Sequence, residues 1–232
     1  MMLPRLRKEV AEANISLARF GLVTLTWGNV SGIDRERGLM VIKPSGVPYD
    51  HLKPGDMVVV DLKGKIAEGR LKPSSDTPTH IELYRNFARI GGITHTHSIY
   101  ATVFAQAQKE MPCFGTTHAD HFHGAVPVTR LLTEVEVLNE YERNTGRVIV
   151  ERMAGIDPMS IPAIFVAGHA PFCWGKSAAD SVINSMALER VAEMALGMYR
   201  VNPEARPLPE YILDKHYGRK HGPHASYGQK KR

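Results

Sequence analysis

The chain has 232 residues, of which 43% are hydrophobic and 23% are charged, so it can bury the core of one large domain or two small ones. No apolar run has the length of a membrane span, and the first residues lack a signal-peptide pattern, which argues against a membrane or secreted protein. Two cysteines, Cys113 and Cys173, are too few for a disulfide framework, so we expect reduced thiols and a cytoplasmic location.

The net charge of +5 comes from the end of the chain. Residues 214–232 hold six of the 29 Lys and Arg side chains and one of the 24 acids, which leaves 23 of each sign in the rest. This basic tail, from about residue 218, has no accompanying aromatic stripe or nucleic-acid-binding motif. We therefore expect no nucleic-acid partner, and a tail that is solvated or helps to hold an anionic substrate.

Apolar residues at three- and four-residue spacing predict the helices. The first stripe runs from Leu6 to Phe20 and stops at Gly21, a natural C-cap. The segment 74–78 supplies capping side chains and a proline for the first turn of another helix. The predicted helices cover residues of about 5–20, 74–88, 99–106, 133–141, 177–200 and 208–217.

Short runs rich in β-branched residues, bounded by turn residues, predict the strands. They cover residues 22–27, 30–33, 39–42, 57–61, 65–68, 93–97, 126–128, 147–150 and 164–167. The strands cluster in the middle of the chain, and no repeat or low-complexity linker divides it. We therefore expect a single α/β domain over residues 1–232, with a central mixed or antiparallel sheet covered by helices.

Two histidines in the predicted strand 93–97 are candidate metal ligands. His95 and His97 are two residues apart, so on a strand both side chains point to the same face. Asp76 lies upstream, and His169 follows another predicted strand. Three histidines and a carboxylate suit Zn²⁺ with an open position for a substrate. The alternative is a set of unconnected histidines, each satisfied by a hydrogen bond, which is the role we expect for His118, His121 and His123.

A second group of residues resembles a phosphate cradle. It combines one cation, several hydroxyls and exposed backbone at a helix N-terminus, where an anion is favoured. Its members are Lys43, Ser45, Gly46, Ser74 and Ser75. The alternative is a Pro-Ser-Gly turn beside an ordinary helix cap. There is no Walker motif and no Gly-x-Gly-x-x-Gly, so neither ATP nor NAD is implied. Asp120 and Tyr227 are candidate acid–base groups, and each alone is weak evidence.

Together these motifs resemble the sugar-phosphate epimerases of the class II aldolase/adducin family. The similarity lies in segments 24–31, 43–46, 73–80, 92–97, 115–120, 214–217 and 227–229, and so runs nearly the full length of the chain. It implies a three-layer α/β/α fold with a mainly antiparallel central sheet. It also implies a homotetramer with active sites between neighbouring subunits.

The resemblance assigns roles to residues of this sequence. His95, His97 and His169 match the Zn²⁺ ligands, with Asp76 beside or on the metal, and Asp120 and Tyr227 match the proton-transfer positions, the tyrosine coming from a neighbouring subunit. The substrate and phosphate positions fall on Gly28, Asn29, Lys43, Ser45, Gly46, Ser74 and Ser75.

The implied reaction is the metal-dependent conversion of L-ribulose 5-phosphate to D-xylulose 5-phosphate by cleaving and re-forming the C3–C4 bond. Asp76 favours this epimerisation, because family aldolases that cleave fuculose phosphate carry Glu there. The alternatives are a class II sugar-phosphate aldolase, a non-catalytic adducin-like binding module and a zinc hydrolase. The chain departs from the family pattern at His121 and His123 and in the basic extension after Gln229.

Overall fold

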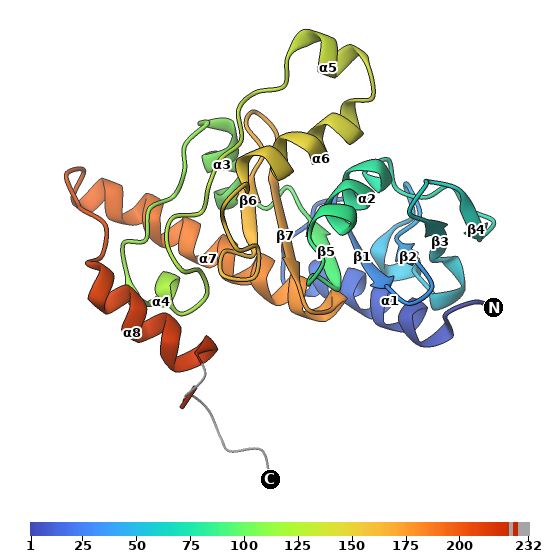
Figure 1. The fold of residues 1–232 in the computed structure, drawn as a ribbon, viewed down its shortest axis with the longest axis horizontal. Helices are drawn as coiled ribbons and strands as arrows, with labels where there is room; N and C mark the ends of the chain where they lie inside the picture. Colours follow the sequence, from blue (N-terminus) through green and yellow to red (C-terminus); the bar gives the residue numbers. More distant parts are fainter. Residues whose placement is uncertain (223–224, 227–232) are drawn as a thin grey trace.

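The computed structural model describes residues 1–222 and 225–226 and is organised around one seven-stranded sheet (Figure 1). The strands are β1 Asn29–Asp34, β2 Leu39–Ile42, β3 Val58–Asp61, β4 Ile66–Glu68, β5 Gly92–His95, β6 Ala163–Phe165 and β7 Pro171–Gly175. Their order across the sheet is β4-β3-β2-β1-β5-β7-β6, and each pair of neighbours is antiparallel. The antiparallel option of the sequence prediction is therefore confirmed.

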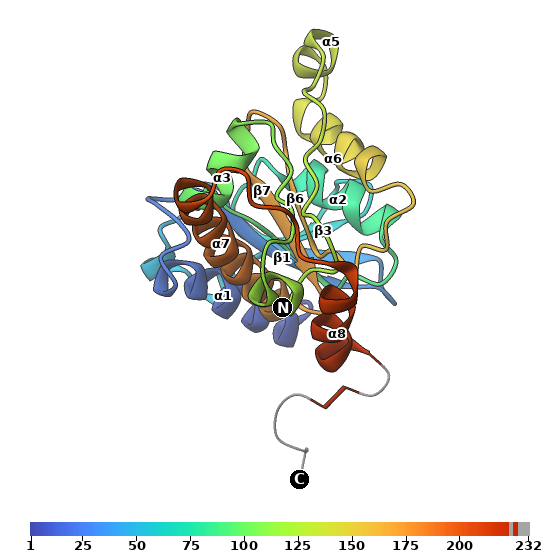
Figure 2. The same ribbon diagram turned by 90° about the vertical axis from the view of Figure 1, so that its left-hand side faces the viewer.

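Helices cover both faces of this sheet, which confirms the three-layer α/β/α class. Figure 2 shows the strands between two helical layers. One layer contains α1 Pro4–Arg19, α3 Ile99–Gln106 and α7 Ala178–Val201, and the other contains α2 Thr77–Asn86 and α6 Tyr141–Arg152. The remaining helices are α4 Thr116–Ala119, α5 Glu134–Leu138 and α8 Glu210–His221, with short 3₁₀ turns at Tyr49–His51 and Pro54–Asp56.

The strands feed two cores because successive side chains point to opposite faces of a sheet. Met40 and Ile42 of β2 are fully buried beneath α2 and α6, whereas Val41 between them is buried beneath α1 and α7. The same alternation holds for β3. Within the described residues, no helix is both long enough and apolar enough to cross a lipid bilayer.

Three predicted strands do not form, and one strand was missed. Residues 147–150 lie inside α6, where the buried residues recur with a helical period and pack against α2. Residues 22–27 form a loop, and the backbone carbonyl of Trp27 accepts a hydrogen bond from the Tyr49 hydroxyl instead of a strand partner. The missed strand is β7. Residues 126–128 make only isolated bridges, through Val126 and Val128.

Sheet register brings distant residues to one edge. Because β1 and β5 are antiparallel, the end of β5 lies beside the start of β1, and His95 pairs directly with Asn29. On the other side, His95 pairs with Phe172 at the start of β7. The β6–β7 turn, which contains His169, therefore lies beside the end of β5.

Candidate metal centre and active site

Three histidine rings meet at this edge of the sheet. One nitrogen from each of His95, His97 and His169 lies within 4.8 Å of the others, and their ring centroids are 4.9–5.0 Å apart. Only His95 belongs to β5, because the strand ends there and His97 lies two residues beyond it. The predicted strand is therefore too long by two residues, yet the two rings are neighbours.

The His95 ring is fixed in position by its surroundings. It stacks on Phe172 at a centroid distance of 4.2 Å, and its Nδ1 is 2.9 Å from the carbonyl oxygen of Pro171. Because a carbonyl only accepts, Nδ1 carries the proton and donates it, which leaves Nε2 with a free lone pair. Burial lowers the pKa of His95 and of His97, and lowers that of His169 to about 4. All three rings are thus neutral near pH 7, the form that binds a metal.

Asp76 adds a carboxylate to this group. It occupies the N-cap position of α2, but its side chain does not cap the helix. Instead, one carboxylate oxygen accepts a hydrogen bond from Asn29 Nδ2 at 2.6 Å. Burial alone raises the pKa of Asp76, but the His95 and His80 rings and the Asn29 hydrogen bond outweigh it, so the net pKa lies below its ordinary value. Asp76 is therefore ionised near pH 7.

The residues fit a divalent cation. Three neutral imidazoles and a carboxylate are the usual donors for Zn²⁺, and three protein nitrogens leave a coordination position for a substrate. Nδ1 of His169 is buried without a hydrogen-bond partner among the described residues. An unsatisfied buried nitrogen within such a group favours a ligand role over four unrelated hydrogen-bonding roles.

The residues of the predicted phosphate cradle come from two loops held side by side. Ser45 N donates to the carbonyl of Lys72 at 2.9 Å, and Ser74 N donates to the carbonyl of Lys43 at 3.0 Å. These two backbone hydrogen bonds keep segment 43–46 against the start of α2. Ser74 Oγ also accepts a hydrogen bond from Asn29 Nδ2 at 3.1 Å, which connects the cradle to Asp76.

Lys43 is a buried cation without an acidic partner among the described salt bridges. Its side chain is 2% exposed, and Nζ donates to the Pro44 carbonyl at 3.3 Å and lies 4.9 Å from the centre of the Tyr49 ring. Burial lowers the pKa of Lys43 to about 8. The Tyr49 hydroxyl donates a hydrogen bond to the loop that contains Gly28, with its oxygen 2.8 Å from the Gly28 carbonyl oxygen. A buried, unpaired ammonium is costly unless it has an anionic ligand.

Gly28 meets a strict steric requirement. Its φ is +79°, and a Cβ at this position would lie 2.7 Å from the carbonyl oxygen of His95. Any other residue would push the loop away from β5. Gly28 therefore allows the adjacent Asn29 to reach Asp76.

One cavity of about 550 Å³ joins the histidines to the cradle. Eleven of the thirteen predicted site residues line it: Gly28, Asn29, Lys43, Ser45, Gly46, Ser74, Ser75, Asp76, His95, His97 and His169. Its wall also includes Trp27, Tyr141 and Glu142, to which the sequence interpretation gave no role. The sequence predicted a helix over residues 133–141, but nothing local placed Tyr141 beside a metal site.

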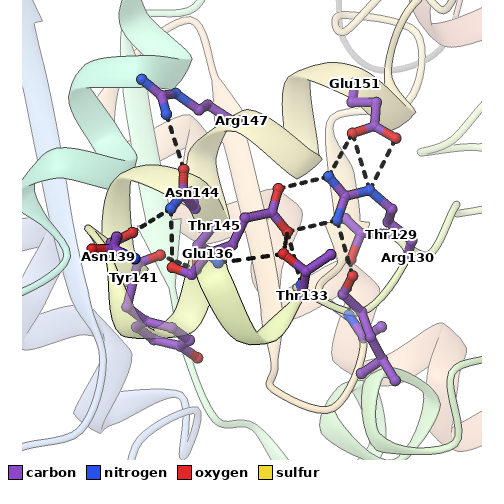
Figure 3. Close-up of polar contacts among 12 residues, drawn as sticks. Thr129, Arg130, Thr133, Glu136, Asn139, Tyr141, Asn144, Thr145, Arg147 and Glu151 are labelled. Atoms are coloured by element: carbon purple, nitrogen blue, oxygen red, sulfur yellow. Dashed lines mark hydrogen bonds and ion pairs between the residues drawn. The ribbon is translucent and has the colours of Figure 1, made fainter.

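A braced arm, residues 129–141, positions Tyr141 and Glu142. Figure 3 shows Arg130 bonded to both Glu136 and Glu151, which ties the arm to α6. Asn144 donates to backbone carbonyls at both ends of this turn, those of Glu136 and Asn139.

The start of α6 is also anchored to α2. Thr79 Oγ1 donates to the carbonyl of Glu142 at 2.5 Å. Glu140 has a left-handed backbone with φ +57°, a conformation that is unfavourable for a residue with a side chain. These contacts hold Tyr141 with its ring centroid 6.3 Å from that of His169.

Asp120, one of the two predicted proton-transfer residues, does not line this cavity. Tyr227 lies outside the described residues. Asp120 follows α4 and binds α8, where Arg219 donates to both of its carboxylate oxygens at 2.8–3.2 Å and His216 Nδ1 lies 3.1 Å away. Burial raises the pKa of Asp120, but the bonds to Arg219, His216 and Lys220 outweigh it and lower the pKa to about 2. Figure 1 shows α4 and α8 at the lower left, far from the β6–β7 turn.

Sequence comparison identifies related proteins over most of the chain. The family profile described as Class II Aldolase and Adducin N-terminal domain matches residues 8–196. The L-ribulose-5-phosphate 4-epimerases UlaF of Salmonella paratyphi B and Salmonella typhi are each 54% identical over 226 residues, covering 97% of this chain and 99% of the relative.

Solved structures share the fold. An L-fuculose 1-phosphate aldolase has a TM-score of 0.74 at 25% identity, covering 93% of this chain and 95% of its own. YgbL from Klebsiella pneumoniae, described as a putative aldolase/epimerase/decarboxylase, has a TM-score of 0.73 at 26% identity, covering 93% of this chain and 99% of its own.

Proposed function

The chain belongs to the class II aldolase and adducin family, and on that premise we propose that it epimerises L-ribulose 5-phosphate to D-xylulose 5-phosphate at C4. The 54% identical relatives carry the name of this activity and match almost end to end. The related aldolase structure is less similar, at 25% identity. The chain is therefore an enzyme, and these sequence identities favour an epimerase over an aldolase or a binding module.

The observation that carries the proposal is the shared cavity. The His95, His97 and His169 group lies at one end, and Lys43 with the 43–46 and 72–75 loops lies at the other. A ketopentose 5-phosphate has the same arrangement, with a vicinal oxygen pair at C2 and C3 and a phosphate at C5. A non-catalytic module has no need for either group.

The positions of the functional groups in the substrate restrict the reaction. The carbonyl is at C2 and the inverted centre is C4, so loss of the C4 hydrogen gives no enolate. Transient oxidation at C4 would need a nicotinamide cofactor, and the sequence has no dinucleotide fingerprint. The remaining route is cleavage of the C3–C4 bond after the C4 hydroxyl loses its proton. The released glycolaldehyde phosphate turns its other carbonyl face and adds back to C3.

We assign different roles in this reaction to different residues of the cavity. We assign the phosphate to Lys43 and to the hydroxyl and backbone donors of the cradle, which retain the two-carbon fragment while it turns. His95, His97 and His169 would hold the cation, with Asp76 beside it. A bound divalent cation supplies Lewis-acid stabilisation of negative charge on the C2 and C3 oxygens. Asn29 orients Asp76 through their 2.6 Å hydrogen bond. Zn²⁺ is the ion we propose.

We assign proton transfer at the C4 oxygen to Asp120 and Tyr227. Asp120 does not line the cavity of its own chain, and it is bound to α8. We propose that a neighbouring copy in a homotetramer supplies both Asp120 and Tyr227, one on each side of the C4 oxygen. Trp27, which lines the cavity, is 52% exposed, and Leu25, two residues before it, is 76% exposed; both would be covered in such an assembly.

The cysteines and the substrate both bear on the cellular location of the enzyme. Cys113 and Cys173 are buried free thiols, and the substrate is a phosphorylated metabolite, so we place the enzyme in the cytoplasm. The description of residues 1–232 as a single domain stays a prediction.

The direct test is incubation of the purified, Zn²⁺-loaded protein with L-ribulose 5-phosphate. Formation of D-xylulose 5-phosphate without net release of glycolaldehyde phosphate supports the epimerase. Net release of the two fragments would indicate an aldolase, and no conversion together with metal binding would contradict both enzymes.

A further inference from the structure

His80 is buried beside the metal-site carboxylate and has no role in the scheme above. It lies one helical turn after Asp76 on α2, and its backbone N–H donates to the Asp76 carbonyl at 3.0 Å. Residues four apart share one face of a helix, so the two side chains point to the same side. The His80 side chain is completely buried, with its ring edge-on to Phe172 at 6.0 Å.

One ring nitrogen of His80 is satisfied by a buried polar chain. Nδ1 is 2.7 Å from Ser31 Oγ, and Ser31 Oγ is 2.8 Å from the Tyr84 hydroxyl. Ser31 is two residues after Asn29 on β1, so the two side chains share a face of the strand. This face of β1 therefore contacts α2 twice, with Asn29 holding Asp76 and Ser31 holding His80.

The directions of these hydrogen bonds determine the tautomer. A phenol is more acidic than a serine hydroxyl and is the better donor, which favours the arrangement in which Tyr84 donates to Ser31. Ser31 then uses its own proton to donate to Nδ1 of His80. An Nδ1 that accepts belongs to a neutral ring whose proton is on Nε2.

The other nitrogen, Nε2, is buried without a partner among the described residues. A buried N–H left unpaired is unfavourable, so its position calls for an acceptor. Asp76 is the nearby anion, because it lies one helical turn before His80 on the same face and is held by Asn29, two residues before Ser31 on β1.

We propose that His80 is a positioning residue whose Nε2–H, at the end of the Tyr84–Ser31–His80 chain, holds the Asp76 carboxylate at the occupied metal site. Outer hydrogen bonds of this kind fix the orientation of a ligating carboxylate. With Asn29 donating from β1, Asp76 is then held from two sides. The inference rests on the proposed metal site.

Two substitutions separate the donor from the bulk of the ring. His80→Asn places an amide near Nδ1, which keeps the Ser31 contact and removes the Nε2 donor. His80→Gln places its amide near Nε2 and keeps a donor towards Asp76. We expect Zn²⁺ affinity, measured by competition with a chromophoric chelator, to fall about 10- to 100-fold in His80→Asn. His80→Gln should stay close to the wild type.

Unchanged affinity in His80→Asn, or an equal loss in both variants, would overturn the role of the Nε2 donor. A measurement on the wild type does not depend on variant folding: ring ¹⁵N NMR should show a neutral His80 protonated at Nε2, and a bare Nε2 would contradict the proposal. If the wild type binds no Zn²⁺, the metal site itself fails. If it binds Zn²⁺ and His80→Asn binds equally well, only the positioning role fails.

Discussion

We expect the buried charge of Lys43 to destabilise the folded chain and to be needed for substrate binding. The ammonium is 2% exposed and has a carbonyl and an aromatic ring, but no carboxylate, as described partners. Replacing Lys43 with Met keeps the length and packing of the side chain and removes its charge. We therefore expect Lys43→Met to stabilise the folded chain and to weaken substrate binding.

The size of the stability effect follows from the pKa of Lys43. Its fall from 10.5 to about 8 corresponds to about 3 kcal/mol against the charged form in the folded state. Below pH 8 the lysine is charged in both folded and unfolded chains, so folding carries the full free-energy cost of burying this charge. As the pH rises from about 8 to 10.5, the folded chain loses its proton first and the cost disappears. Lys43→Met should thus be more stable by up to about 3 kcal/mol at pH 7, and this gain should shrink above pH 8.

The effect on binding has the opposite sign. A hydrogen bond between charged groups contributes about 1.5–3 kcal/mol, which corresponds to about a 10- to 150-fold rise in KM. Because the phosphate is bound in ground and transition states alike, kcat should change less than KM. The wild-type KM should also rise above pH 8, as the free enzyme loses the Lys43 proton, while the KM of Lys43→Met stays flat.

The assay combines urea unfolding from pH 7 to 10.5 with steady-state kinetics for L-ribulose 5-phosphate. Lys65→Met is the matched control, because Lys65 is exposed and does not line the cavity. The control should leave both stability and KM unchanged. Equal stability and equal KM for Lys43→Met and the wild type would refute the argument that this buried cation is kept for a phosphate.

Three further predictions concern the metal, the bond that breaks and the neighbouring copy. His97→Asn should fold as the wild type does and lose bound metal, and chelation should abolish wild-type activity that Zn²⁺, Mn²⁺ or Co²⁺ restores; full activity of metal-free protein would contradict the site. In D₂O the C4 hydrogen should be retained in the product, and deuterium at C4 seen by NMR would exclude C3–C4 cleavage. His97→Asn and Tyr227→Phe subunits should each be inactive yet regain activity when co-assembled, because a mixed tetramer contains sites with an intact metal group and an intact tyrosine; no recovery would place Tyr227 in its own chain's site.

The sequence could predict the parts of the site that depend on local rules. A two-residue spacing on a strand placed His95 and His97 together, and the cap pattern at 74–78 located the start of α2 and with it Asp76. Even so, the local rules gave an incomplete reason for the glycines at 91–92. Two glycines after a predicted helix are typical of a helix break, whereas a Cβ on Gly92 would lie 2.3 Å from the Ser177 carbonyl oxygen, so Gly92 also lets β5 approach the start of α7.

The parts that could not be predicted depend on contacts between distant segments. Residues 147–150 are a β-branched run that local propensity assigns to a strand, but packing against α2 makes them helical. Tyr141 and Glu142 are held at the cavity by contacts between distant segments, such as the bond between Arg130 and Glu151, which are 21 residues apart. The Asn29–His95 pairing follows from sheet register, which short patterns do not determine.

The contacts of Asp120 allow a more specific test of whether a neighbouring copy supplies the proton-transfer groups. Asp120 is bound to Arg219 and His216 of α8, and Tyr227 follows six residues after the end of that helix. Because Asp120 is bound to α8 and Tyr227 is close to that helix in the sequence, we expect one copy to supply both groups to its neighbour's cavity. Asp120→Asn and Tyr227→Phe subunits should then fail to rescue each other, since every site would receive one of the two lesions, while each should rescue His97→Asn. Recovery in the first mixture would mean that the two groups reach the site from different copies, and the two-sided proton assignment would need a different geometry.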